Sequence, residues 1–214
     1  SLSGKRVAIV GNQTSVIKGT HLVDTLISLG VNITKVFSPE HGFRGDADAG
    51  EKVKSGVDDK TGVPLISLYG NNKKPRQSQL ADVDVIVFDV QDVGVRFYTY
   101  ISTLHYVMEA CAENNIPLIV LDRPNPNAHY IDGPVRDEFH KSFIGMHPVP
   151  IVYGMTIGEY ADMINNECWL SDSVGCDLYV VPCKNYTHET KYILPVPPSP
   201  NLRSDFAISL YPSL

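Results

Sequence analysis

Short apolar runs alternate with amphipathic stretches along most of the chain. Residues 7–10 read Val-Ala-Ile-Val and end at Gly11, which is typical of a buried strand. Residues 83–88 form the clearest apolar run, and a parallel strand that is covered on both faces is apolar throughout. We therefore predict a central strand there. Further strands are predicted over residues 33–37, 65–68, 116–121, 151–153 and 178–181.

Apolar residues at helical spacing separate these strands. They predict helices over residues 21–29 and 101–112. Thr156 and Glu159 have the spacing of a capping box, which predicts a third helix that runs to about Asn165. Strands that alternate with helices imply right-handed βαβ units. The fold class is therefore α/β, with a doubly wound, mainly parallel sheet and helices on both faces, as in Rossmann-like proteins.

Composition and charge narrow the class of protein. The chain has 214 residues, of which 43% are hydrophobic, so it can bury a core without a disulfide or metal. No apolar run approaches the ~18 residues that a transmembrane helix needs. The 24 acidic residues outnumber the 18 basic ones, which disfavours sequence-independent nucleic-acid binding. We expect the four cysteines to be buried or loop thiols, with a Cys168–Cys176 or Cys176–Cys183 disulfide as the alternative in an exported protein.

Motifs for common cofactors and metals are missing from the sequence. The loop at residues 11–15 follows the first strand but is not GxGxxG, so a nucleotide-dependent enzyme is disfavoured, and no P-loop sequence occurs. The seven histidines form neither HExxH nor HxH, and Asp46 with Asp48 does not extend into an EF-hand pattern. We predict no cofactor and no bound metal.

Polar, chemically versatile loops follow the predicted strands, and ligands of open α/β sheets bind at the carboxyl ends of strands. Residues 38–45 (SPEHGFRG) combine Glu40, His41 and Arg44, and a glutamate close to apolar residues can act as a general acid. A solvated, salt-bridged loop is the alternative. Residues 89–100 (DVQDVGVRFYTY) offer carboxylates, an amide and aromatic faces, which suit sugars.

Two further interpretations of these loops remain open. Asp89 is also explained as a helix cap or as a partner of Arg96. Residues 122–127 (DRPNPN) form a turn that Pro124 and Pro126 make rigid, and this turn presents asparagine donors and acceptors.

Five segments in order resemble one family. They are SPEHGFRG with DADAG (38–50), DVQDVGVRFYTY with ISTL (89–104), LDRPNPN (121–127), YGMTIGE (153–159) and VPPSPNL (196–202). This family was long catalogued as a domain of unknown function, and its characterised members are exo-acting β-N-acetylmuramidases of peptidoglycan recycling. The resemblance covers nearly the whole chain. Ser15, where a glycine is expected, and the pair Ala128-His129, where a glycine-rich stretch is usual, depart from the pattern.

The resemblance implies an activity and a set of site residues. The activity is glycoside hydrolysis that releases N-acetylmuramic acid from the non-reducing end of peptidoglycan fragments. By position, Glu40 is the candidate general acid, with Asp89 or Asp92 as the second carboxylate, or Asp46 or Asp48 by proximity in sequence. The other residues placed at the substrate site are Asn12, His41, Arg44, Asp46, Gln91, Arg96, Tyr98, Arg123, Asn125 and Asn201.

Arg44 or Arg96 is expected to hold the lactyl carboxylate, because a guanidinium binds carboxylates through two parallel bonds. A non-catalytic module that binds peptidoglycan sugars is the alternative function, since the same arginines and aromatic residues serve binding.

The resemblance also implies a second domain. We expect residues 1–194 to form the Rossmann-like catalytic domain, and residues 195–214 to be a proline-rich segment that leads to a C-terminal domain absent from this chain. That domain would complete the cleft, so the 214 residues alone are expected to lack full activity. The expected location is periplasmic or secreted, although the chain shows no signal peptide.

Overall fold

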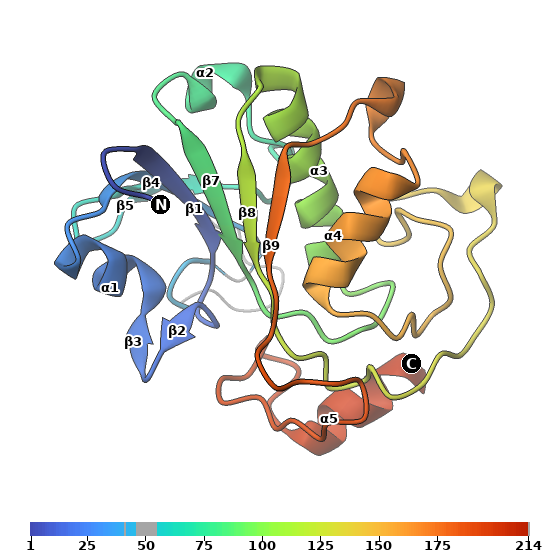
Figure 1. Cartoon of the computed structure of the whole chain (residues 1–214). Coiled ribbons are helices and arrows are strands. Elements are labelled where there is room, and N and C mark those ends of the chain that lie inside the picture. Colours follow the sequence, from blue (N-terminus) through green and yellow to red (C-terminus); the bar gives the residue numbers. More distant parts are fainter. Residues whose placement is uncertain (41, 46–54, 214) are drawn as a thin grey trace.

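The computed structural model describes residues 1–40, 42–45 and 55–213. His41 and Asp46, both predicted site residues, lie outside these residues, as does Asp48. Within the described part a seven-stranded sheet forms the centre of the molecule, in the order β5-β6-β4-β1-β7-β8-β9 (Figure 1). Its strands are β1 (Arg6–Gly11), β4 (Asn32–Ser38), β5 (Gly56–Val57), β6 (Pro64–Ser67), β7 (Val85–Asp89), β8 (Leu118–Leu121) and β9 (Leu178–Val181).

The order of the strands confirms the predicted fold class. Apart from β5, which runs antiparallel to β6 at one edge, all neighbouring strands are parallel. The chain builds from β1 outward through β4 to β6, then returns to the centre and builds β7, β8 and β9 on the other side. This is the strand order of doubly wound dinucleotide-binding folds, in which the order reverses between the two central strands. Here that switch point lies between β1 and β7, where Gly11 is level with Asp89.

Helices cover both faces of the sheet (Figure 1). The described helices are α1 (Leu22–Ser28), α2 (Gln77–Leu80), α3 (Tyr100–Asn114), α4 (Ile157–Asn166) and α5 (Asp205–Leu210), with 3-10 turns η1 (Glu138–His140), η2 (Ser171–Ser173) and η3 (Tyr211–Ser213). On one face, Leu22 and Val23 of α1 pack in a cluster with Val7 and Ile9 of β1. The other face packs against α3 and α4 in the larger cluster.

The strong sequence signals for helices and strands are confirmed. The apolar run at 83–88 becomes β7, all five residues of which are buried. At α4 the Thr156 hydroxyl accepts the Glu159 amide hydrogen bond while the Glu159 carboxylate accepts that of Thr156, so the capping box is present. The reciprocal bonds satisfy two backbone donors that the first turn of a helix leaves without partners.

Several predictions from weaker signals are wrong. Residues 151–153 do not form a strand, because Val152 makes only isolated antiparallel bridges to Val95 and Asp132. The loop after β1 leads first into a short hairpin, β2 (Val16–Ile17) with β3 (Thr20–His21), before α1 begins. No strand was predicted at β5 and no helix at α2. These elements are two to four residues long, too short to carry a periodic pattern.

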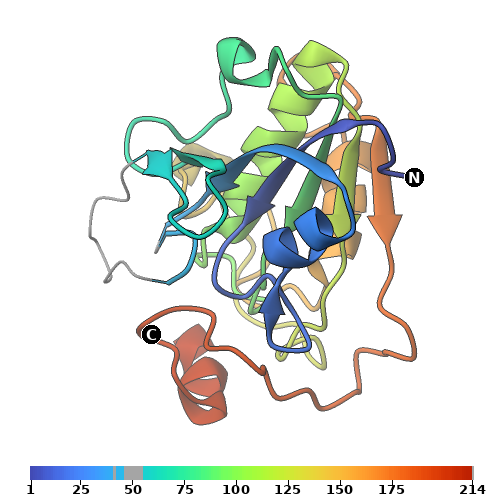
Figure 2. The ribbon, with the colours of Figure 1, turned by 90° about the vertical axis from the view of Figure 1, so that its left-hand side faces the viewer.

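The end of the chain returns to the sheet. Residues 195–200 form no helix or strand, as predicted, but Ser204 caps α5 with a side-chain bond to the Ala207 amide. Figure 2 shows this segment, in red, lying beneath the carboxyl ends of the strands. Leu202 and Ile208 are buried in the larger core cluster. The segment therefore forms a wall across the edge of the sheet where ligands bind in this fold class.

All four cysteines are free, so neither disulfide considered above is formed. Cys111 and Cys176 are buried, whereas Cys168 is exposed. Among the described residues, no helix has the length and apolar character required to cross a membrane.

Candidate active site

The crevice at the switch point between β1 and β7 is filled by the protein's own polar side chains. The Ser15 hydroxyl donates to the backbone oxygen of Asp89, and the Thr14 hydroxyl accepts a bond from the Gln91 backbone N–H at 3.0 Å. The Asn12 side chain accepts from Thr14 through Oδ1 at 2.9 Å. These side chains are almost completely buried. The hydrogen bonds therefore join the ends of the two central strands into one rigid floor.

A cavity opens beside this floor, and Glu40 lies in its lining. We call it the Glu40 cleft; its volume is about 260 Å³. Glu40 follows the carboxyl end of β4, and the far wall comes from the segment that follows β9. The lining residues are Glu40, Phe97, Tyr98, Thr99, Tyr100, Ile144, Ser199, Asn201, Leu202 and Tyr211. Glu40 is the one carboxylate among them.

Aromatic rings make up much of the wall of the cleft. The rings of Tyr98 and Tyr100 meet edge to face at 4.8 Å, and Tyr211 meets Phe97 at 5.1 Å. The Tyr98 hydroxyl donates to the Pro198 carbonyl at 2.8 Å, which fastens the C-terminal segment to the loop after β7. Edge-to-face pairs and buried hydroxyl bonds hold such rings in one orientation.

Charge at Glu40 is felt by the tyrosines around it. The negative charge of Glu40 is the main cause of a raised pKa at Tyr69, because a second negative charge nearby is unfavourable. At Tyr211, burial raises the pKa first, and the charge of Glu40 adds to it. The Tyr100 hydroxyl contacts the Glu40 backbone oxygen at 3.3 Å. The hydroxyls of Tyr69 and Tyr211 thus stay protonated near the Glu40 carboxylate.

Asp92 is fully buried behind the tyrosines rather than in the lining of the cleft. Its Oδ2 accepts bonds from the Gly94 amide, at 2.7 Å, and from the Tyr153 hydroxyl. No described residue is bonded to its buried Oδ1. Burial raises the pKa of Asp92 to about 6, and its hydrogen bonds only partly oppose that rise. The Asp92 charge in turn contributes to the raised pKa of Tyr98, after burial as the main cause.

Asp89 is paired, but not with the partner that the sequence suggested. Its Oδ1 accepts from Arg123 Nε at 2.6 Å, so the interpretation of Asp89 as a partner of Arg96 is wrong. The pair joins the carboxyl ends of β7 and β8, and only 4% of the Asp89 side chain is exposed. Arg96 Nη1 donates instead to the carbonyl oxygens of Pro134 and Val149.

Arg44 lies in an ion-pair cluster on the α1 side. Its Nε and Nη2 donate to the two Asp58 oxygens at 2.7 and 2.8 Å, and Nη2 also contacts Asp24 at 3.0 Å. The paired guanidinium lowers the pKa of Asp58 to about 2. Lys60 bonds to Asp24 at 2.6 Å. The alternative of a salt-bridged loop therefore describes Arg44 well.

The asparagine turn after β8 supports its neighbours. Asn125 Nδ2 donates to the Met155 carbonyl at 2.8 Å, and Oδ1 accepts the Asn127 amide at 2.8 Å. Gly94 packs directly on this amide, with φ +75°, so that an added Cβ would lie 2.3 Å from Asn125 Nδ2. Gln91 Nε2 donates to the Pro124 carbonyl at 2.8 Å. These side chains hold three loops together.

The predicted residues therefore divide into groups. Glu40, Tyr98 and Asn201 come together at the cleft, and Asn12 supports it from below through a 3.0 Å bond to the Tyr100 hydroxyl. The rest of the described ones (Arg44, Asp89, Gln91, Asp92, Arg96, Arg123 and Asn125) do not belong to the lining. Tyr211 and Ser199 line the cleft but were not predicted. Ser199 lies in the VPPSPNL motif, whereas Tyr211 lies beyond it, and no pattern in the sequence indicated that the chain returns to the cleft.

Within residues 1–40, 42–45 and 55–213, no three His, Cys, Asp or Glu side chains group in a way that would hold a metal ion.

Comparison of the sequence with known protein families identifies the family of this chain. Residues 7–205 match the family described as "Exo-beta-N-acetylmuramidase NamZ, N-terminal". The chain belongs to this family. The NamZ family match covers the floor at the switch point, Glu40 and most of the C-terminal segment.

Individual proteins that resemble this chain support its membership of the NamZ family. The chain is 44% identical to the peptidoglycan β-N-acetylmuramidase NamZ of Bacillus subtilis, over 99% of this chain and 52% of that protein. Two crystal structures of DUF1343 family proteins from Bacteroides fragilis match with TM-scores of 0.90 and 0.88, at 49% and 39% identity. They cover 99% and 98% of this chain, and 56% and 54% of theirs. The chain thus spans about half the length of these relatives.

Proposed function

We propose that the protein is a peptidoglycan glycosidase that releases N-acetylmuramic acid from the non-reducing end of glycan fragments, with Glu40 as general acid. The observation that carries the proposal is the placement of Glu40, which is the one carboxylate among the described residues that line a cavity walled by aromatic rings. Membership of the NamZ family and the named activity of the Bacillus subtilis relative support it.

Hydrolysis of a glycosidic bond requires a proton at the glycosidic oxygen. In the proposed reaction the Glu40 carboxyl group donates that proton and the bond from the sugar C1 to the oxygen breaks. Water then adds to C1 of the positively charged sugar and gives up one proton to the second carboxylate. The faces of Phe97 and Tyr211 provide flat apolar surface for a sugar ring, and Asn201 offers an amide to its hydroxyl groups. Tyr69 lies close enough to Glu40 to feel its charge and helps to orient it.

Asp89 and Asp92 were the two described candidates for the second carboxylate, and we now propose a different role for both. Asp89 is paired with Arg123, and Asp92 is buried behind the tyrosines of the cleft. We assign both as positioning residues, which act by holding the strand ends and the loop after β7. Asp46 or Asp48 stays a prediction for the group that activates water. A C-terminal domain that completes the cleft and a location outside the cytoplasmic membrane stay part of the proposal, because peptidoglycan is the substrate.

The test is turnover of a chromogenic β-N-acetylmuramide by the complete gene product. Glu40→Gln should lower kcat by about 10²–10⁴-fold, because it removes a general acid, and should leave the folded state unchanged by circular dichroism. Glu138→Gln, at an exposed glutamate of η1, is the matched control and should keep full activity. Near-normal turnover by Glu40→Gln would exclude Glu40 as the acid. Binding of the sugar without cleavage by the unchanged protein would favour a non-catalytic module.

A further inference from the structure

A second cavity lies beside α5 and shares no lining residue with the Glu40 cleft. We call it the α5 cavity; its volume is about 320 Å³, at the lower end of the roughly 300–1,000 Å³ of small-molecule sites. Its walls come from the turn after β8 (residues 126–129), the connection after β9 (residues 188–193) and α5. Both of the first two segments follow carboxyl ends of parallel strands, so the cavity lies at the ligand-binding edge of the sheet.

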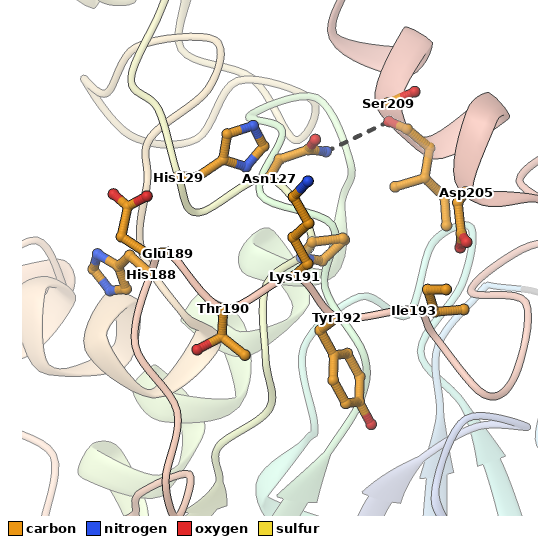
Figure 3. Close-up of a pocket in the computed structure, with 12 residues that line it drawn as sticks. Asn127, His129, His188, Glu189, Thr190, Lys191, Tyr192, Ile193, Asp205 and Ser209 are labelled. Carbon is orange, nitrogen blue, oxygen red and sulfur yellow. Dashed lines mark hydrogen bonds between the residues drawn. The ribbon is translucent and has the colours of Figure 1, made fainter.

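The α5 cavity combines an apolar wall with charges of both signs. Ile193, Ile208 and Pro126 supply apolar surface, and Ile193 is 72% exposed although it lines a concave site. Figure 3 shows the Lys191 side chain rising from its segment toward His129 and Asn127, with Asp205 on the α5 side of the cavity. Lys191 and Asp205 therefore line the same small space from different walls, and Glu189 adds a second carboxylate on the segment that carries Lys191.

Among the described residues, no ion pair includes Lys191 or Asp205. Asp205 lies in the first turn of α5, where a negative charge is favourable. His188, at the far end of the cavity, is in contrast bonded to Glu159 at 2.8 Å. Asn127 is fixed by bonds from Nδ2 to the carbonyls of Val93, at 2.9 Å, and Ile208, at 3.4 Å, so one wall is rigid.

We propose that the α5 cavity binds a short peptide or amino acid with a free amino group and a free carboxyl group. Lys191, assisted by His129, would pair with the carboxylate, and Asp205 with the ammonium group. Charge-assisted hydrogen bonds are about twice as strong as neutral ones, and two of opposite sign at fixed positions select a zwitterion over a singly charged ligand. The apolar wall suits a small aliphatic side chain. This site is separate from the Glu40 cleft and does not depend on the hydrolysis proposed above.

Calorimetric titration of the complete gene product with alanyl-alanine, in the L,L and D,D forms, tests the proposal. We expect saturable binding that weakens about tenfold or more when the peptide is N-acetylated or C-amidated, since each change removes one charged bond. Lys191→Met and Asp205→Asn should each weaken binding about tenfold, Lys191→Arg should retain it, and Lys184→Met, at an exposed lysine outside the cavity, should have no effect.

Three results would overturn the proposal. They are the absence of binding by both dipeptides, equal binding by Lys191→Met and the unchanged protein, and equal binding of the N-acetylated peptide. Circular dichroism and urea unfolding of each variant check that the protein remains folded. Glu40→Gln should bind the dipeptide normally, so a failure here and a failure of the proposed hydrolysis are distinguishable.

Discussion

Replacing Asp92 by asparagine should change how the stability of the protein depends on pH. The Asp92 carboxyl group is fully buried, and burial raises its pKa from 3.8 to about 6. A shift of one pKa unit corresponds to about 1.4 kcal/mol, so a shift of about two units corresponds to about 3 kcal/mol. Asparagine has nearly the same shape but does not titrate. The variant therefore isolates the contribution of this one proton.

The sign follows from counting protons in the two states. Between pH 3.8 and about 6, Asp92 keeps its proton in the folded protein and loses it in the unfolded chain. The free energy of unfolding therefore falls as the pH rises through this window, and the contribution of Asp92 is most favourable below pH 3.8. Above about pH 6 both states are ionised, and the full loss of about 3 kcal/mol has been reached. In Asp92→Asn this component of the pH profile is absent.

Urea unfolding at pH values from 4 to 7.5, for the unchanged protein and for Asp92→Asn, measures the difference. Asparagine leaves a buried N–H without an acceptor, which costs about 1–3 kcal/mol at every pH, so the slope rather than the absolute stability is the readout. Asp84→Asn is the control, because the half-buried Asp84 pairs with Arg6, its pKa is lowered to about 2, and its titration falls below this window. A difference between protein and variant that does not vary with pH would refute the reasoning.

Three further variants test the framework around the Glu40 cleft. Arg123→Met should lower the free energy of unfolding by about 3 kcal/mol, because it leaves Asp89 buried without its partner. A loss below 1 kcal/mol in urea unfolding would contradict this. Gly94→Ala should cost at least about 2 kcal/mol, because φ is +75° and the new Cβ would lie 2.3 Å from a side-chain nitrogen. Gly175→Ala, where nothing lies within 4 Å of the added Cβ, should leave the free energy of unfolding nearly unchanged. Thermal unfolding of both glycine variants measures the difference. Tyr98→Phe removes one hydrogen bond, worth about 1 kcal/mol, and should hasten proteolytic cleavage in residues 195–204; unchanged cleavage would argue against that anchor.

The fold could be predicted from sequence wherever a periodic signal was long enough. Residues 83–88 had to be a central strand, because their apolar character on both faces fits only burial between helices. At 151–153 the same reasoning failed. Val152 is buried through tertiary bridges to Val95 and Asp132, and an apolar triplet carries no information about that. The helix α5 was missed because of its six residues only Ile208 is buried, which leaves no stripe to detect.

The site was harder to predict than the fold, for a different physical reason. The position of Glu40 after a parallel strand was enough to place it at the correct edge of the sheet. The far wall of its cleft depends on where the chain goes after β9. Tyr211 reaches the cleft only because Tyr98 and Gln13 bind the carbonyls of the proline-rich segment. Such long-range contacts leave no local pattern.

Position at a strand end also does not say which way a polar side chain points. Buried polar groups need hydrogen-bond partners, and loops at the end of a sheet are rich in backbone groups that need the same. Four polar side chains bond in this way to neighbouring strands and loops: Asn12, Asp89, Gln91 and Asn125. Their residue types are those of a binding site, but their contacts hold the loops in place. Substitutions at these four should therefore lower stability and activity together, whereas a substitution at Glu40 should lower activity alone. Plotting the melting temperature against kcat for both sets separates the two roles.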